Sequence, residues 1–263
     1  MAFIILLIPQ AMAVRVEIIV DGNIGGNVEY FEMDENVEGV QEFVLQWYNS
    51  QSISCSSIAE FDIYKEGELA GTTWSEKKVM MSGVSDSFYS YWIPDETGNY
   101  SLRIRIHHCH EIIETELMNF TVSSVPVPEE KIQIETKNMP DGLVQVKVLS
   151  PEDLKDVAVV PEDYPIGWIM SGKKIDLEAG REKTIFIEYE PPVWIKEDAN
   201  IMAISLDGKT SSPKDRVVLE KKQSFMEEHG LIVMAALIIL LVLSTVTNIL
   251  ILLKRRNLKH RKL

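Results

Sequence analysis

Apolar and polar residues alternate with a period of two through most of the chain before residue 220. The clearest run has apolar residues at even positions and polar residues at odd positions: Tyr100, Leu102, Ile104, Ile106 against Ser101, Arg103, Arg105, His107. This pattern gives a strand one buried and one wet face, as in an antiparallel sheet. Similar runs cover residues 14–20, 42–49, 59–65, 77–81, 87–93 and 111–122. About seven short strands separated by glycine-containing turns predict a β-sandwich over residues 14–124.

The last of these runs changes phase along its length. Its apolar positions are odd at Ile113 and Leu117 but even at Phe120 and Val122. An extra residue in one strand produces such a change, so we expect a β-bulge near Met118.

A proline-rich segment separates this first sandwich from a second series of alternating runs. Pro126 and Pro128 suit a short, semi-rigid linker over residues 125–130. Alternation then resumes at 132–134, 144–148, 157–159, 185–189, 202–206 and 217–219. These runs predict a second, smaller sandwich over residues 131–219, followed by a stalk at 220–229.

The two ends of the chain predict a membrane protein. Residues 230–253 hold no charged side chain, and a helix of that length spans about 35 Å, enough to cross a bilayer. Six basic residues follow in the tail at 254–263, so the positive-inside rule makes this tail cytoplasmic and the preceding residues external. Residues 1–13 end in Ala11-Met12-Ala13, which is typical of a signal peptide. We therefore expect a single-pass type I protein of the cell membrane.

Charge excludes one class of partner. Residues 14–229 contain all 40 Asp and Glu but 20 of the 26 Lys and Arg, and a body this acidic repels phosphate backbones. Nucleic acid is therefore not expected as a partner. The sequence also contains no nucleophile elbow, phosphate loop or dinucleotide fingerprint, so we do not expect an enzyme.

Two motifs resemble immunoglobulin-like modules. Asp95-Glu96-Thr97-Gly98-Asn99-Tyr100 resembles the turn into the sixth strand of these sandwiches, in which the tyrosine hydroxyl pins the preceding corner, although Leu102 stands where antibody domains have a core cysteine. Pro165-Ile166-Gly167-Trp168, with Leu177, Gly180 and Pro191-Pro192, resembles modules of α-galactosidases and of archaeal or bacterial surface proteins. The resemblance implies two tandem immunoglobulin-like β-sandwiches that serve as spacers or adhesion units. With the uncharged run described above, the expected fold is all-β, with these two sandwiches followed by one C-terminal transmembrane α-helix.

Cys55 and Cys109 are the two cysteines of the chain. If residues 42–49 and 99–108 form the second and sixth strands, both strands run toward the same end of the sandwich. Cys55 then lies in the loop after one strand, and Cys109 directly follows the other. Thiols oxidise outside the cell, so we predict a Cys55–Cys109 disulfide.

The string His107-His108-Cys109-His110-Glu111 is the candidate metal site. Alternate residues of a strand share a face, so His108 and His110, with Glu111, can converge on Zn or Cu. No distant residue presents itself as a further ligand. The simpler interpretation is a set of solvated loop histidines in a protein without a cofactor.

Three further features concern the predicted location. Asn99-Tyr100-Ser101 and Asn119-Phe120-Thr121 match the acceptor pattern for an N-linked glycan, with Asn99 at the more exposed corner. Ser244 and Asn248 lie four residues apart on one face of the predicted transmembrane helix, where polar side chains can bind another transmembrane helix. The alternative is that these side chains hydrogen-bond to their own helix or lie near the membrane interface.

Together these features predict a non-enzymatic type I membrane protein that displays two β-sandwiches outside the cell. Its expected role is recognition of a protein or glycan partner, adhesion or envelope structure. Two alternatives remain open: a metal-binding surface protein that uses the histidine segment His107–His110, and an accessory subunit of a membrane complex.

Overall fold

The computed structural model describes residues 25–115, 117–140, 142–165, 167–191 and 196–220, together with Ser244. Every element with assigned bounds in these ranges is a β-strand, which confirms the all-β prediction for this part of the chain. The predicted signal peptide at 1–13, the run at 14–20, and residues 221–263 apart from Ser244 lie outside the described residues. Among those described, no helix has the length and apolar character needed to cross a bilayer.

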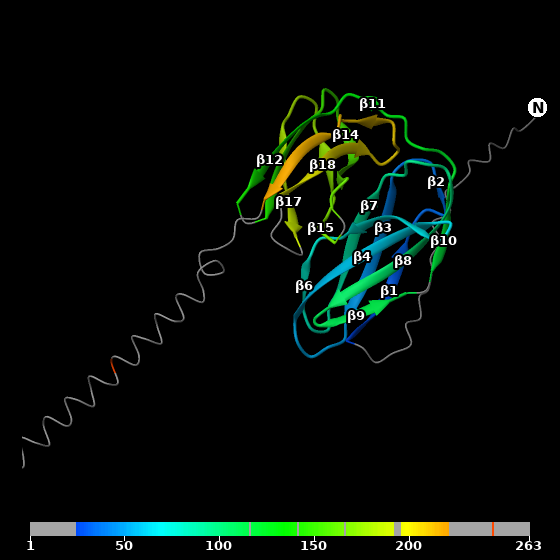
Figure 1. The fold of residues 1–263 in the computed structure, drawn as a ribbon, viewed down its shortest axis with the longest axis vertical. Helices are drawn as coiled ribbons and strands as arrows, with labels where there is room; N and C mark the ends of the chain where they lie inside the picture. The colour runs from blue at the N-terminus through cyan, green and yellow to red at the C-terminus, as the bar shows by residue number, and fades with distance from the viewer. Residues whose placement is uncertain are drawn as a thin grey trace, which may run out of the picture. The chain divides into compact units, whose positions relative to one another are not determined.

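The first half folds into two facing sheets (Figure 1). One sheet has the order β1-β3-β7 and the other the order β2-β10-β8-β4-β5, with β6 beside β4 and β9 beside β8. Their bounds are β1 Gly26–Glu32, β2 Asn36–Val37, β3 Gln41–Asn49, β4 Cys55–Lys65, β5 Glu68–Trp74, β6 Lys78–Met80, β7 Ser85–Trp92, β8 Gly98–His108, β9 Glu111–Glu114 and β10 Met118–Val122.

The core of this sandwich comes from the alternation in its strands. In β8 each even-numbered residue from Tyr100 to His108 is buried, while the odd-numbered ones are partly exposed. β3 supplies Phe43, Leu45 and Trp47 to the same core, where Phe43 stacks on Phe61 of β4 with ring centroids 5.2 Å apart. Both sheets therefore bury one face against each other, as the period-two pattern predicts.

The predicted bulge is present. β9 and β10 both pair antiparallel with β8, Glu114 facing Arg105 and Met118 facing Leu102. Thr115 still pairs with Ile104, since its amide donates to the Ile104 carbonyl oxygen and its hydroxyl accepts from the Ile104 amide. The register therefore shifts by one residue between Thr115 and Met118, where the change of phase indicates the bulge.

The second half also forms two facing sheets, ordered β11-β19-β18-β14-β16 with β20 beside β18, and β12-β13-β17-β15. Valines of β13 and isoleucines of β17 alternate into a core that includes Trp168, which stacks on Tyr189. The bounds are β11 Glu129–Glu130, β12 Gln133–Met139, β13 Leu143–Leu149, β14 Leu154–Glu162, β15 Ile169–Met170, β16 Lys173–Leu177, β17 Lys183–Glu190, β18 Lys196–Ser205, β19 Thr210–Ser211 and β20 Asp215–Glu220.

A third apolar cluster joins the two sandwiches. Val40 and Tyr91 of the first pack with a group from the second: Ala158, Val160, Met202, Ile204. Gly39 is required at this junction, because a Cβ there would lie 2.6 Å from the Leu206 carbonyl oxygen. The Tyr164 hydroxyl also donates to the Thr72 carbonyl oxygen across the junction, at 2.7 Å. The two sandwiches therefore pack against each other through side chains, in addition to being joined by the connecting segment.

Candidate functional site

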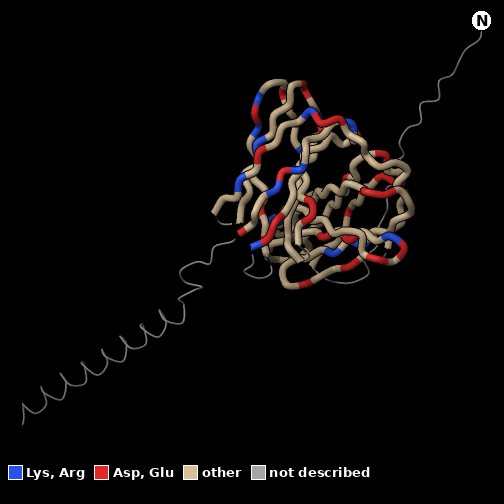
Figure 2. Tube along the Cα trace, turned by 45° about the horizontal axis from the view of Figure 1, so that its top comes forward, with Lys and Arg blue, Asp and Glu red and all other residues tan. Residues whose placement is uncertain are grey.

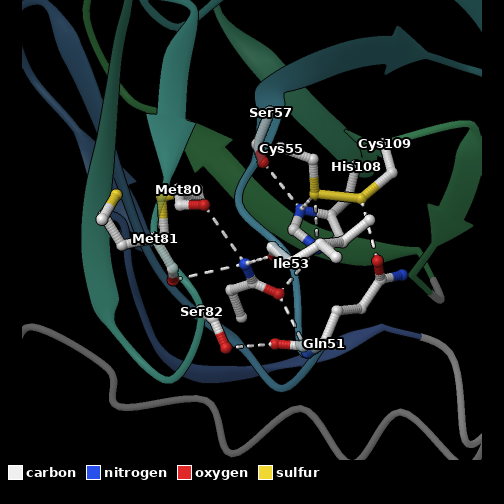
Figure 3. Close-up of a disulfide and its surroundings, with 10 residues drawn as sticks. Gln51, Ile53, Cys55, Ser57, Met80, Met81, Ser82, His108 and Cys109 are labelled. Atoms are coloured by element: carbon white, nitrogen blue, oxygen red, sulfur yellow. Dashed lines mark hydrogen bonds between the residues drawn. A yellow bond between two sulfur atoms is a disulfide. The ribbon is translucent and has the colours of Figure 1, made fainter.

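The disulfide lies at one end of the first sandwich (Figure 3). Cys55 and Cys109 are bonded with an S–S distance of 2.04 Å, which confirms the predicted pairing. The strand context differs from the expectation. Cys55 is the first residue of β4 rather than a loop residue, and β4 pairs directly with β8, which ends at His108. The bridge therefore ties two neighbouring strands of one sheet.

His108 lies behind the bridge and is fully buried. Its Nδ1 lies 2.7 Å from the Ser57 hydroxyl and its Nε2 lies 3.2 Å from Asn49 Oδ1. A carbonyl oxygen can only accept, so Nε2 carries the proton and Nδ1 accepts from Ser57. Burial lowers the pKa of His108 below its ordinary value. The imidazole is therefore a neutral structural group that both neighbours orient.

Asn49 holds the adjoining loops together. It is fully buried, and its Nδ2 faces the carbonyl oxygens of Ile53, Met80 and Met81 at 3.0 to 3.2 Å. The Gln51 amide donates to its Oδ1 at 3.0 Å. Because one side chain satisfies backbone groups of the loop at 50–54 and of the end of β6 with its following turn at 79–84, these two segments share a fixed geometry. We call residues 49–55, 79–84 and 108–111 the tip.

The tip presents apolar side chains to solvent. Ile53 and Met81 are each 59% exposed, Val84 is 46% exposed and Val79 is 71% exposed. The Ser54 hydroxyl lies 3.5 Å from the Met81 sulfur, which places the two loops side by side at this surface. Isolated exposed apolar residues are ordinary, but a group on one rigid end is typical of an interaction surface.

The predicted ligands His108, His110 and Glu111 do not come together as a metal site among the described residues. His108 points into the core with both ring nitrogens hydrogen-bonded, whereas His110 lies in the exposed turn after β8 and Glu111 is exposed on β9. The ligand atoms that do lie close together, within 4.8 Å, are those of Cys55, His108 and Cys109, but the two sulfurs are bonded to each other. The alternation of β8 explains why the predicted ligands do not converge. Its even-numbered residues are buried through His108, so this side chain faces the core, away from His110 and Glu111.

Both predicted glycan acceptors, Asn99 and Asn119, are exposed. They lie on adjacent strands, β8 and β10, on the outer face of the sheet. Of the predicted helix-association pair, Ser244 is helical and exposed, while Asn248 lies outside the described residues.

A charged cluster that the sequence motifs do not reveal lies on the outer face of β4 and β8, made of Glu60, Asp62, Arg105 and His107. Arg105 Nη2 lies 2.8 Å from Glu60 Oε1 and 2.5 Å from Asp62 Oδ2, and His107 Nε2 lies 2.8 Å from Glu60 Oε2. Burial alone would lower the pKa of Arg105, but Glu60 and Asp62 outweigh it and raise the pKa above the ordinary value.

Glu60, Asp62 and Arg105 of the charged cluster line a cleft of about 530 Å³, to which Tyr164 and Lys214 of the second sandwich also contribute. Its carboxylates are already paired, and Thr72 also donates to Asp62 at 2.7 Å. The sequence does contain a signal, since Glu60 and Asp62 fall on the polar phase of one run and Arg105 and His107 on that of another. Their meeting depends on pairing between strands about 45 residues apart.

Comparison with known proteins adds little to this geometry. No protein-family model matches the sequence, and no curated protein matches it. Among solved structures, red sea bream transglutaminase is similar over 75% of this chain and 32% of its own, with 11% identity and a TM-score of 0.30. Dimeric latent PorU from Porphyromonas gingivalis is similar over 75% of this chain and 20% of its own, with 10% identity and a TM-score of 0.29. The chain thus spans about a third and a fifth of these proteins, and its similarity to them is low.

Proposed function

We propose that this chain is a non-enzymatic, single-pass type I membrane protein that displays two immunoglobulin-like sandwiches outside the cell and recognises a partner through the tip. The observation that carries the proposal is the construction of the tip. A disulfide and the buried Asn49 fix two loops whose outer surface is apolar, and such pre-ordering lowers the entropic cost of binding.

Two further features support parts of the proposal. The Tyr100 hydroxyl donates to the Glu96 carbonyl oxygen at 2.9 Å, which is the corner bond that the immunoglobulin-like resemblance implies. A disulfide is typical of proteins outside the cytosol, which agrees with the predicted signal peptide and membrane helix.

Charge restricts the kind of partner. Residues 26–122 contain 17 Asp and Glu but 5 Lys and Arg, whereas residues 129–220 contain 19 and 12; Figure 2 marks the described ones along the trace. A partner that approaches the first sandwich therefore meets a strongly acidic domain around an apolar tip. A protein with an apolar patch and a basic rim fits these requirements.

Site-specific crosslinking in intact cells tests this proposal. A photoreactive side chain at Met81 should give a discrete protein adduct, because this residue is exposed at the tip beside Ser54. The same group at Phe186, which is 44% exposed on β17 of the second sandwich, serves as the matched control and should not give that adduct. Ile53→Asp should abolish the Met81 adduct. Identical adducts from both positions, or none from Met81, would argue against recognition through the tip.

A further inference from the structure

The two glycan acceptor motifs lie directly opposite each other across one strand pair. In the antiparallel register of β8 and β10, Asn99 faces Thr121, Tyr100 faces Phe120 and Ser101 faces Asn119. Each acceptor asparagine therefore lies opposite the hydroxyl residue of the other motif. The aromatic residues between them point inward and stack, with ring centroids 5.6 Å apart, so both acceptors and both hydroxyls lie on the outer face.

A hydrogen bond links the two motifs. The Thr121 hydroxyl donates to Asn99 Oδ1 at 3.1 Å. An N-linked sugar is attached to the amide nitrogen and leaves the oxygen free, so this bond is compatible with modification of Asn99. The bond orients the Asn99 amide. Because Thr121 bonds to the amide oxygen, it does not engage the Nδ2 nitrogen to which a sugar would be attached. Both asparagines line one surface hollow of about 630 Å³, together with Tyr64 and Gly67.

We infer that Asn99 and Asn119 are alternative acceptors for a single N-linked glycan on this face, with Asn99 preferred. The inference rests on the external location proposed above. Asn99 and Asn119 are diagonal neighbours across the strand pair, with Cα atoms about 7 to 8 Å apart. A branched sugar on one asparagine therefore occupies the hollow that the other needs. Asn99 is preferred because it follows Gly98 at the start of β8, beside a turn, whereas Asn119 lies within β10.

The chemistry requires a donor, which is a lipid-phosphate-linked oligosaccharide. The Asn99 Nδ2 forms a bond to the anomeric carbon of the sugar, and the bond between that carbon and the phosphate oxygen breaks. The lipid phosphate leaves with the bonding electron pair, and one amide proton passes to a base. No oxidant or reductant takes part. The glycan covers the outer face near β8 and β10 and leaves the tip, at the opposite end of β8, uncovered.

Intact-mass and glycopeptide mass spectrometry of the full chain from its native host tests this inference. The unaltered chain should carry one glycan per molecule, mostly on Asn99. Asn99→Gln removes the acceptor, while Ser101→Ala removes the motif and retains Asn99 with its bond from Thr121. Both variants should raise Asn119 occupancy several-fold, and Asn119→Gln should leave Asn99 occupancy unchanged. The double variant Asn99→Gln/Asn119→Gln should carry no glycan.

Two results would overturn the inference. Molecules with both positions occupied would show that the hollow accommodates two glycans, and an unmodified chain would show that the motifs are not used. The external location is tested separately, by labelling a cysteine introduced at Val127 with a membrane-impermeant maleimide on intact cells. A chain that is labelled in this way but carries no glycan would overturn the glycan inference and leave the proposed function standing. A chain that is not labelled would overturn both.

Discussion

Replacing both cysteines with serine is expected to lower the free energy of unfolding by about 4 kcal/mol, because the bridge closes a loop with a sequence separation of 54 in the unfolded chain. This is a large share of the stability of an ordinary domain, which is about 5 to 15 kcal/mol. The prediction applies to Cys55→Ser/Cys109→Ser, since a single substitution leaves a reactive thiol. Urea denaturation of a fragment ending at Lys221, with tryptophan fluorescence as the signal for unfolding, measures the effect.

Reduction supplies the control for this experiment. A reductant should shift the denaturation midpoint of the unaltered protein toward that of the double variant and should not change the double variant. If the double variant unfolds at the same urea concentration as the oxidised protein, the bridge does not stabilise the tip and its rigidity must have another source.

Removing Arg105 should produce the second large effect. Its partners Glu60 and Asp62 have side chains 9% and 2% exposed, so Arg105→Ala leaves two nearly buried carboxylates without their cation. Leaving one partner of a buried ion pair uncompensated costs about 3 kcal/mol or more, and the partial exposure of Arg105 favours the lower end. Chemical denaturation of the same fragment measures the loss.

Arg103 is the matched control for Arg105. It lies two residues earlier on the same face of β8, and it pairs with Glu114 at 3.3 Å, where the two side chains are 36% and 52% exposed. An exposed pair of this kind contributes less than about 1 kcal/mol, so Arg103→Ala should be nearly silent. Equal losses from both variants would mean that the charged cluster behaves as a solvated surface.

Which face of a strand is buried could be predicted, because it depends on the alternation of apolar and polar residues within that strand alone. Alternation in β3 and β8 reports which side chains enter the core, and the change of phase near Met118 reports the bulge. The sequence does not predict β5, because Trp74 is the one buried residue in Glu68–Trp74 and the strand carries no apolar alternation. Continuing the even phase of β8 by one step would have placed His108 in the core and removed it from the metal ligands.

The candidate site depends on contacts that local patterns do not contain. The disulfide could be predicted from two cysteines near one end of a sandwich, but not its position between two adjacent strands. The role of Asn49 depends on loops about 30 residues apart. The charged cluster and the register of the two glycan motifs likewise depend on which strands pair, and alternation does not specify strand partners.

The external placement of both sandwiches is tested most directly by labelling intact cells with a membrane-impermeant maleimide. Val127 is 91% exposed in the segment between the sandwiches, and both native cysteines are in the bridge, so Val127→Cys provides a single reactive thiol. Asn257→Cys places a thiol in the predicted cytoplasmic tail as the control. We expect Val127→Cys to be labelled in intact cells and Asn257→Cys to be labelled only after permeabilisation. The reverse pattern would contradict the external placement of the sandwiches.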